Sequence, residues 1–392
     1  MRFREFTDSW TLIPIKKLLR FQNGINADST KYGKGIKYIS VSDILNNQYI
    51  TYDCIKGLID IDEKTLNKFI VEYGDILFQR SSETFEDIGR ANVYLDKEHS
   101  ATFGGFVIRG KKISDYNPLF FRYLLCTHNA RKQTVRMGAG AQHYNIGQEG
   151  LEKICLYFPC LREQQKISDF LSAIDNKIAV QNKIISKYET LIKGLTDCLL
   201  NKKEDNYYTF KDLYLKAGEG GTPTTDNNSY YENGTIPFIK IDDLSQKYIK
   251  RNSDYITHLG LEKSAAWLIP TNSVIFSNGA TIGRISINTY PIATKQGVLG
   301  IVPSSIVMAE YLYYYMKTTY FRRQVRRITV KGTMDCAYLK DLNSIICHIP
   351  DINHQEKRIA LLTVLDEKIA CERMILQKLK EQKKYLLSKM FI

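Results

Sequence analysis

Residues 161–201, LREQQKISDFLSAIDNKIAVQNKIISKYETLIKGLTDCLLN, decide which architecture this chain can adopt. Seam residues in this segment recur at alternating steps of four and three, which is the spacing of a heptad repeat. The seam consists of Ile167, Leu171, Ile174, Ile178, Gln181, Ile185, Tyr188, Ile192, Leu195 and Leu199. A long helix with an apolar stripe this narrow needs a second helix to cover the stripe.

A second copy of the same segment lies at the C-terminal end of the sequence. Residues 350–392 align with residues 159–201 without a gap, and the second seam includes Leu362, Leu365, Ile369, Glu372, Leu376, Leu379 and Leu386. If the two helices pack antiparallel in full overlap, Gln181 lies opposite Glu372, and a buried polar pair of this kind fixes the register at some cost in stability. The alternative, in which both polar residues face solvent, is equally compatible with the sequence.

The rest of the chain repeats as well. Residues 74–78 and 272–276 each look like a strand followed by a polar loop, and a helix is predicted over residues 118–136 and over residues 311–327. We therefore predict an α+β fold built as a pseudo-two-fold tandem repeat, in which two globular domains are each followed by a long helix and the two helices pair as a coiled coil. The predicted boundaries are 1–158 and 204–349 for the domains, and 159–203 and 350–392 for the helices.

The composition favours a polyanionic partner. Lys and Arg number 55 against 42 Asp and Glu, a net charge of +13, and the alternative is a merely basic protein. The eight Cys form no Cys-x-x-Cys pair and no cluster with His at zinc spacing, which predicts reduced thiols and no bound metal. Because the sequence contains neither a signal-peptide core nor a run of about eighteen apolar residues, we expect a soluble cytoplasmic protein without a membrane partner.

Three enzymatic interpretations fail on their motifs. An adenine methyltransferase needs an Asp/Asn-Pro-Pro-aromatic motif, but residues 117–120 read Asn-Pro-Leu-Phe, and the Phe-Gly-Gly-Phe of residues 103–106 has too few glycines for an S-adenosylmethionine loop. No Walker loop for ATP is present. Asp366 and Lys368 resemble part of a nuclease site, but they lie two apart on the heptad helix and therefore on different faces. We expect a non-catalytic chain.

What the sequence does favour is nucleic-acid binding. Each of the two predicted domain helices ends in basic residues and is followed at once by a polar loop, and residues 317–331 contain no acidic side chain. Arg and Lys neutralise phosphates, while polar side chains on loops can reach base edges and specify sequence. The same placement in both halves favours a binding surface over a solvated charged face.

Several motifs together resemble one family. Residues 163–167 and 175–178, their repeats within residues 355–369, and the aromatic-Pro or Ile-Pro pair before each long helix are similar to the specificity (S) subunits of type I restriction-modification systems. The Ile-Gly-Arg tripeptides at residues 88–90 and 282–284 resemble the target-recognition domains of the same family. Residues 84–87 depart from the short Gly/Ser/Thr loop that is commoner there.

The resemblance implies a division of function between domains and helices. Each target-recognition domain would read one half of a split, asymmetric site in double-stranded DNA. The two helices would pack as an antiparallel coiled coil and act as a spacer between the domains. Two methyltransferase (M) subunits carrying S-adenosylmethionine would bind the helices and the apolar surfaces left exposed there, and restriction (R) subunits would join for cleavage. This chain would hold no cofactor, and it would work in a bacterium or archaeon, associated with the nucleoid.

The candidate DNA contacts come from the basic helix ends and the polar loops. The predicted phosphate contacts are Arg136, Arg323, Arg326, Arg327 and Lys331, and the predicted base contacts are Arg80, Ser82, Gln142, His143, Ser277, Asn278, Thr333 and Met334. The Ile-Gly-Arg motif adds Arg90 and Arg284. Two rival functions stay open, namely an interaction scaffold whose basic charge is incidental and a self-sufficient DNA-modifying enzyme.

Overall fold

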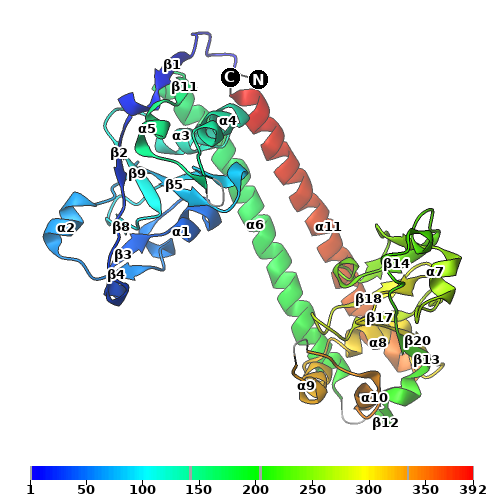
Figure 1. Cartoon of the computed structure of the whole chain (residues 1–392). Helices are drawn as coiled ribbons and strands as arrows, with labels where there is room; N and C mark the ends of the chain where they lie inside the picture. The colour runs from blue at the N-terminus through cyan, green and yellow to red at the C-terminus, as the bar shows by residue number, and fades with distance from the viewer. Residues whose placement is uncertain (1, 141–143, 203–204, 333–334, 392) are drawn as a thin grey trace. The chain divides into compact units, whose positions relative to one another are not determined.

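The structure is a computed structural model, and it describes residues 2–140, 144–202, 205–332 and 335–391. The chain divides into two compact units (Figure 1). Unit 1 comprises residues 1–182 and 374–392, and unit 2 comprises residues 183–373. Each unit therefore combines one globular domain with a part of both long helices.

Two small sheets form the framework of unit 1. The first sheet is antiparallel, in the order β2–β9–β5–β7, with β2 Leu19–Asn23, β5 Ile76–Gln79, β7 Ala91–Val93 and β9 Val107–Lys112. The second has the order β4–β3–β8, with β3 Tyr32–Ile39, β4 Leu58–Ile59 and β8 Thr102–Phe103. Strand β5 is buried at all four positions, as expected for the apolar run predicted there. Short pairings complete the domain, formed by β1 Thr11–Pro14 with β11 Cys155–Phe158 and by β6 Ser81–Ser82 with β10 Tyr144–Asn145.

The helix predicted over residues 118–136 is two helices, so that prediction was wrong. Helix α3 (Pro118–Leu125) ends at Cys126, and α4 (His128–Arg136) begins after Thr127, whose side chain accepts a hydrogen bond from the Ala130 N–H. A threonine cap of this kind starts a new helix although the apolar spacing continues across it. The remaining short helices of the domain are α1 Val41–Asn46, α2 Glu63–Lys68 and α5 Gln148–Glu152.

Unit 2 repeats this topology. Its main sheet has the order β13–β20–β17–β18–β15, and its smaller sheet has the order β16–β14–β19. The strands are β12 Asn206–Thr209, β13 Tyr214–Glu219, β14 Ile236–Ile239, β15 Tyr248–Ile249, β16 Tyr255–Ile256, β17 Val274–Ser277, β18 Ile285–Asn288, β19 Ala293–Thr294, β20 Val298–Pro303 and β21 Ile346–Ile349. The helices are α7 His258–Glu262, α8 Ala309–Tyr315, α9 Thr319–Ile328 and α10 Leu339–Leu342. Thr318 caps α9 as Thr127 caps α4, so the helix predicted over residues 311–327 is also two helices.

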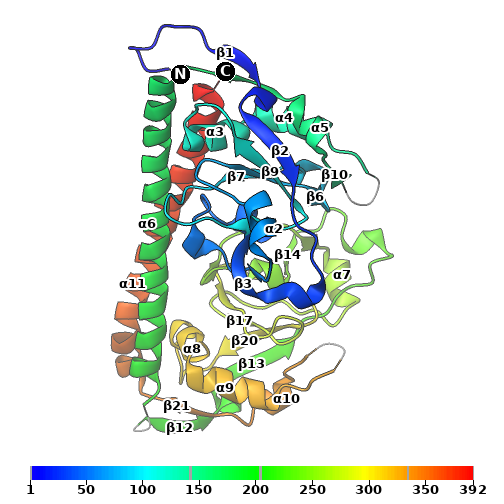
Figure 2. The ribbon, with the colours of Figure 1, turned by 90° about the vertical axis from the view of Figure 1, so that its left-hand side faces the viewer.

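The two long helices, α6 (Leu161–Leu200) and α11 (Ile352–Met390), pack antiparallel, as predicted. In unit 1 the seam residues of the first half of α6 share a core with Leu386 and Met390 near the end of α11. The last turn of α11 lies beside α3 (Figure 2), where the Phe391 ring is 5.4 Å from the Phe120 ring. In unit 2 the end of α6 shares a core with Ile359 and Leu362 near the start of α11.

The predicted seam is buried or half-buried along both helices. The fourteen residues predicted to pack between the helices are Ile167, Leu171, Ile174, Ile178, Gln181, Ile185, Leu195, Leu362, Leu365, Ile369, Glu372, Leu376, Leu379 and Leu386, and none of them is exposed. Gln181 and Glu372 are only 8% and 7% exposed, so neither faces solvent. Because the two residues belong to different units, their pairing stays a prediction.

A buried glutamine ties each globular domain to its long helix. In unit 1 the Gln164 side chain accepts a hydrogen bond from the Asn117 N–H at 2.9 Å and donates one to the Pro159 carbonyl at 2.9 Å. In unit 2 the Gln355 side chain accepts from the Met308 N–H at 2.9 Å and donates to the Pro350 and Ile306 carbonyls. We call each set of bonds a glutamine latch. It explains why the Gln of each long-helix motif follows a Pro by five residues.

A tyrosine–aspartate bond repeats one step further along each helix. The Tyr123 hydroxyl of α3 donates to the Asp175 carboxylate of α6 at 2.8 Å, and Tyr314 of α8 donates to Asp366 of α11. Burial comes first among the causes that raise the pKa of each tyrosine, followed by the neighbouring aspartate. The domain helix is therefore fixed to the long helix at two points in both units.

Candidate nucleic-acid interface

In unit 1 three segments meet at the end of the main sheet, around Arg80. The first is the loop that follows β5, and the second is the turn of residues 104–107 between β8 and β9. The third consists of β10 and Ile146. The Arg80 N–H donates to the Phe106 carbonyl at 2.9 Å, and its guanidinium donates to the Gly105 carbonyl at 3.3 Å. The Arg80 carbonyl accepts from the Ile146 N–H at 3.0 Å. Arg80, predicted only as a base contact, therefore also joins the three segments.

The Ile-Gly-Arg motif closes the loop after the strand in both units. Gly89 has a φ of 64° and Gly283 a φ of 98°, which is the left-handed region where glycine has no steric penalty. The Gly89 N–H donates to the Gln79 carbonyl at 3.1 Å, and the Gly283 N–H donates to the Ser277 carbonyl at 3.0 Å. The motif thus returns the chain to the sheet and places an arginine at the base of each loop.

The two motif arginines are each held by a carboxylate. Arg90 pairs with Asp87 at 2.6 Å and is half exposed. Arg284 pairs with Asp242 at 2.9 Å and also donates to the Ile241 carbonyl at 3.1 Å. Contact with a phosphate would have to compete with these carboxylates, so both DNA contacts stay predictions.

Other residues of the unit 1 loop are fixed by their neighbours. Ser82 lies in β6, opposite Tyr144 of β10, and its hydroxyl accepts from the Thr84 N–H at 3.2 Å. Arg131 of α4 donates to the Glu86 and Ile88 carbonyls at 2.8 and 2.7 Å, and burial lowers its pKa. A basic side chain that sequence analysis places among the helix-end cations therefore shapes the loop.

The same three segments meet in unit 2, around Asn278. The Asn278 carbonyl accepts from the Ala337 N–H at 2.8 Å, and the Asn278 and Gly279 N–H groups donate to the Gly297 carbonyl at 3.0 and 3.3 Å. Ser277 is fully buried, where its hydroxyl donates to the Thr281 carbonyl at 2.5 Å and accepts from the Arg284 N–H at 2.9 Å. The Asn278 side chain is also buried. Base contact by Ser277 or Asn278 would require this loop to open, and both stay predictions.

The predicted phosphate contacts are on the surface. Arg136 is exposed at the end of α4. Arg323, Arg326 and Arg327 are exposed on α9, spaced three and four apart, so they share one face, while Phe321 and Val325 are buried on the opposite side. Lys331 follows and is exposed. Among the described residues no carboxylate forms an ion pair with these five cations.

Four predicted base contacts, Gln142, His143, Thr333 and Met334, lie outside the described residues. The predictions for them stay predictions.

The turn at the centre of each site was not predicted from the sequence. In unit 1 this central turn, residues 104–107, presents Phe106 with 68% of its surface exposed. In unit 2 the matching turn, residues 295–298, presents Lys295 and Gln296, which are both exposed. The Phe-Gly-Gly-Phe of residues 103–106 was a usable signal, because adjacent glycines before an exposed aromatic are typical of a tight turn.

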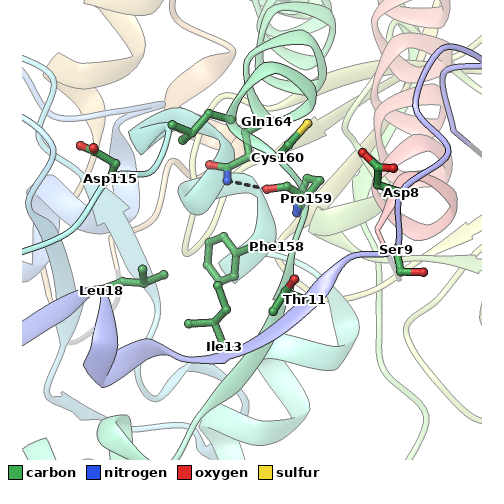
Figure 3. Close-up of a pocket in the computed structure, with 11 residues that line it drawn as sticks. Asp8, Ser9, Thr11, Ile13, Leu18, Asp115, Phe158, Pro159, Cys160 and Gln164 are labelled. Atoms are coloured by element: carbon green, nitrogen blue, oxygen red, sulfur yellow. Dashed lines mark hydrogen bonds between the residues drawn. The ribbon is translucent and has the colours of Figure 1, made fainter.

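In unit 1 a pocket of about 390 Å³ lies beside the latch bond from Gln164 to the Pro159 carbonyl (Figure 3). Asp8 and Asp115 line it, and none of its eleven described lining residues is basic, so it does not suit a phosphate. In the described part of the chain no group of three His, Cys, Asp or Glu could hold a metal ion. Among the described helices none is both long and apolar enough to cross a membrane.

Comparison with solved structures shows the fold. The chain is similar over its full length to the S subunit of a type I restriction-modification system from M. genitalium, with 14% identity, 99% of that chain covered and a TM-score of 0.56. It is also similar to a chain from structural work on complex assembly and conformational transition of the type I R-M system, with 13% identity, 98% of both chains covered and a TM-score of 0.60.

The relatives found by sequence similarity are also specificity subunits. The putative type I restriction enzyme MjaX specificity subunit of Methanocaldococcus jannaschii is 22% identical over 98% of this chain and 93% of its own length. The EcoR124I/EcoR124II specificity subunit of Escherichia coli is 26% identical over 49% of this chain, and the match spans 53% of that subunit's length. The model of the type I restriction modification DNA specificity domain matches residues 9–190 and again residues 203–381. This chain therefore belongs to the family of type I restriction-modification DNA specificity subunits.

Proposed function

We propose that this chain is the DNA-recognition subunit of a type I restriction-modification complex and reads a bipartite, asymmetric site, one half with each unit. The observation that carries the proposal is the repeated meeting of three segments at the end of each main sheet, around Arg80 and around Asn278. The backbone bonds of the two sites correspond, whereas their exposed side chains differ. Two equivalent scaffolds with different surface residues suit two different half-sites.

The proposed contacts with the DNA backbone come mainly from unit 2. Arg323, Arg326, Arg327 and Lys331 form a cationic surface, whereas unit 1 offers Arg136 at the corresponding helix end. Each phosphate that is neutralised releases counterions, so binding should weaken steeply as salt rises. A scaffold with incidental charge would lack this dependence.

The helices carry a second apolar stripe that supports the proposed recruitment of M subunits. Its residues lie beside the seam at heptad spacing and are exposed, namely Phe170, Val180 and Leu191 on α6 and Leu361, Val364, Ile375 and Tyr385 on α11. Phe170 and Leu361 occupy the same position of the repeat. Exposed apolar residues in a regular stripe mark a surface for a protein partner. We infer that each helix contributes to binding one M subunit, and that R subunits join the assembled complex.

The chemistry would then reside in the partners. We infer that this chain is non-catalytic and holds no cofactor, that the M subunits carry S-adenosylmethionine, and that the complex works on chromosomal DNA in the cytoplasm. If this chain alone bound S-adenosylmethionine, the self-sufficient enzyme would replace this proposal.

Methylome sequencing tests the proposed function. One host receives this chain with its cognate M subunit, and the control host receives the M subunit alone. We expect methylated adenines in one bipartite motif only when this chain is present. Exchanging residues 1–158 for those of a relative should change one half of the motif and leave the other half intact. A methylation pattern that is independent of this chain would favour the scaffold function.

A further inference from the structure

We propose that the central turn of each unit is a base-reading element, with Phe106 contacting a thymine methyl group in one half-site and Lys295 with Gln296 contacting a purine in the other. The inference rests on the proposed function and adds to it the residues that specify bases. The Phe-Gly-Gly-Phe of residues 103–106 is typical of a tight turn, but no motif in the sequence marks these three residues as base contacts. They follow from their place at the meeting point of the three segments.

The turn in unit 1 is held rigidly. The Val107 N–H donates to the Gly104 carbonyl at 2.9 Å, which closes the turn, and the Gly104 N–H donates to the Ile39 carbonyl at 3.0 Å. Arg80 binds the next two carbonyls, those of Gly105 and Phe106. Residues 104–106 thus have their backbone fixed at four points. The ring of Phe106 is nevertheless the part of the turn that solvent reaches.

Close packing leaves little freedom at the base of the turn. A Cβ added at Gly105 would lie 1.6 Å from the Asn26 side-chain oxygen, and a Cβ at Gly24 would lie 2.1 Å from the Gly104 carbonyl oxygen. The glycines therefore allow the turn to sit against the segment that follows β2. A rigid turn lowers the entropy that an exposed side chain loses on binding.

The turn in unit 2 has the same bonds. The Val298 N–H donates to the Lys295 carbonyl at 3.2 Å, and the Lys295 N–H donates to the Ile239 carbonyl at 2.9 Å. The Gly297 carbonyl accepts from Asn278 and Gly279, as the Phe106 carbonyl accepts from Arg80. In addition, the Gly297 N–H donates to the Glu219 carboxylate at 2.7 Å. By these bonds Gly297 occupies the position of Phe106, and Lys295 and Gln296 occupy those of Gly104 and Gly105.

The chemistry of the two tips selects different base features. A phenyl ring offers no hydrogen bond, and the apolar feature of a base edge in the major groove is the thymine methyl group. A lysine donates to the O6 and N7 acceptors of guanine, and a glutamine amide matches the N6 and N7 of adenine. The turns therefore predict a thymine preference in the half-site of unit 1 and a purine preference in the half-site of unit 2.

The test uses the complex of the full chain with its M subunit and the motif found by methylome sequencing. Phe106→Ala should relax one position in the unit 1 half-site, and the double variant Lys295→Ala/Gln296→Ala should relax one position in the unit 2 half-site. Each variant is the control for the other, because the opposite half-site should stay unchanged. Ile113→Ala, which removes another exposed apolar side chain from unit 1, should leave the motif intact.

Uracil substitution then tests the methyl contact directly. Replacing the specified thymine by deoxyuracil removes only the methyl group, and wild-type affinity should fall about fourfold, the value of burying one such group. The Phe106→Ala complex should bind both duplexes equally. Because the side chain is exposed, its removal should leave the thermal unfolding midpoint unchanged, which separates loss of contact from loss of fold.

The outcomes distinguish the two levels of the proposal. A motif that depends on this chain but is unaltered by both turn variants overturns the base-reading turn and leaves the proposed function standing. A wild-type complex that is indifferent to every thymine-to-uracil change overturns the thymine contact of Phe106. If no motif depends on this chain at all, the proposed function itself fails, and the turn variants have nothing to alter.

Discussion

In both units a buried glutamine of a long helix binds the start of a domain helix, whereas the central turns, Gly-Gly-Phe in unit 1 and Lys-Gln-Gly in unit 2, share no residue type at matching positions. The attachment and the proposed reading surface have thus followed different constraints. A displaced attachment would misplace the whole domain, so its contacts are kept. A changed turn alters only what the domain presents. If the turns read bases as proposed, position and specificity reside in separate residues of this fold.

The attachment itself is not identical in the two units, and the glutamine latches give the largest expected difference. Gln355 bonds three backbone groups and Gln164 bonds two, and both side chains are buried. Each orphaned backbone group costs about 1 kcal/mol or more. We expect Gln355→Leu to lower the free energy of unfolding by about 3 kcal/mol and Gln164→Leu by about 2 kcal/mol, measured by urea denaturation. Gln377→Leu, on an exposed part of α11, is the control.

An equal loss in both latch variants would contradict the difference between the units. It would show that strain or local relaxation, rather than the number of backbone bonds, decides the contribution of each latch.

The second expected difference between the units concerns the aspartates that accept the tyrosine hydrogen bonds. Asp175 in unit 1 is paired with Lys383 of α11 at 2.5 Å, and both side chains are largely buried. The repeat position of Lys383 in α6 is Ile192, so unit 2 has no matching pair. Lys383→Met leaves a buried carboxylate without its cation and should cost about 2 kcal/mol of unfolding free energy, less than for a fully buried pair because Lys383 is 22% exposed. Lys378→Met, which alters an exposed lysine, should change stability by less than about 0.5 kcal/mol.

The antiparallel direction of the long helices was implied by the family resemblance. Sequence periodicity predicted the helices themselves and their pairing, because a heptad seam is a local pattern that requires a partner. It failed at Thr127 and Thr318, because a cap interrupts a helix without interrupting the apolar spacing. It also could not tell that Ser277 turns inward, since a hydroxyl at the end of a strand faces either way depending on nearby backbone groups. The exposure of Phe106 depends on contacts with Arg80, which is distant in sequence. Patterns therefore predicted the framework and located the loops, but not which loop side chains face outward.

A pH dependence separates the units further. Burial lowers the pKa of Lys317, next to the Tyr313 hydroxyl, to about 8, and the matching residue of unit 1 is Cys126. With the folded pKa lowered, the unfolded chain binds more protons between about pH 8 and the ordinary lysine value, so unfolding free energy rises with pH in that window, by at most about 1.4 kcal/mol per pH unit. Below about pH 8 the burial penalty is fully present. The difference between wild type and Lys317→Met, measured by denaturation from pH 7 to 9.5, should show this slope.

Two features keep that measurement interpretable. Burial raises the pKa values of the neighbouring tyrosines Tyr313 and Tyr314, so their contribution lowers stability only near and above the ordinary tyrosine value, at the upper edge of the window. Cys126→Met in unit 1 is the matched control and should show no slope relative to wild type. A flat difference for Lys317→Met would mean that its amine is solvated in the folded protein.

The smallest expected effect concerns DNA affinity, and it compares the basic helix ends of the two units. Arg326 and Arg327 are exposed on α9, while Arg136 alone ends α4. If each contacts one phosphate, Arg326→Ala/Arg327→Ala should reduce the slope of log affinity against log salt by about 2, and Arg136→Ala by about 1. Arg251→Ala, an exposed arginine outside the predicted surface, should leave the slope unchanged. Because phosphate contacts position the protein without reading bases, both arginine variants should weaken all sequences alike and keep the methylated motif. If a variant changed the motif instead, that arginine would contact a base edge. The helix ends as well as the turns would then contain residues that read bases.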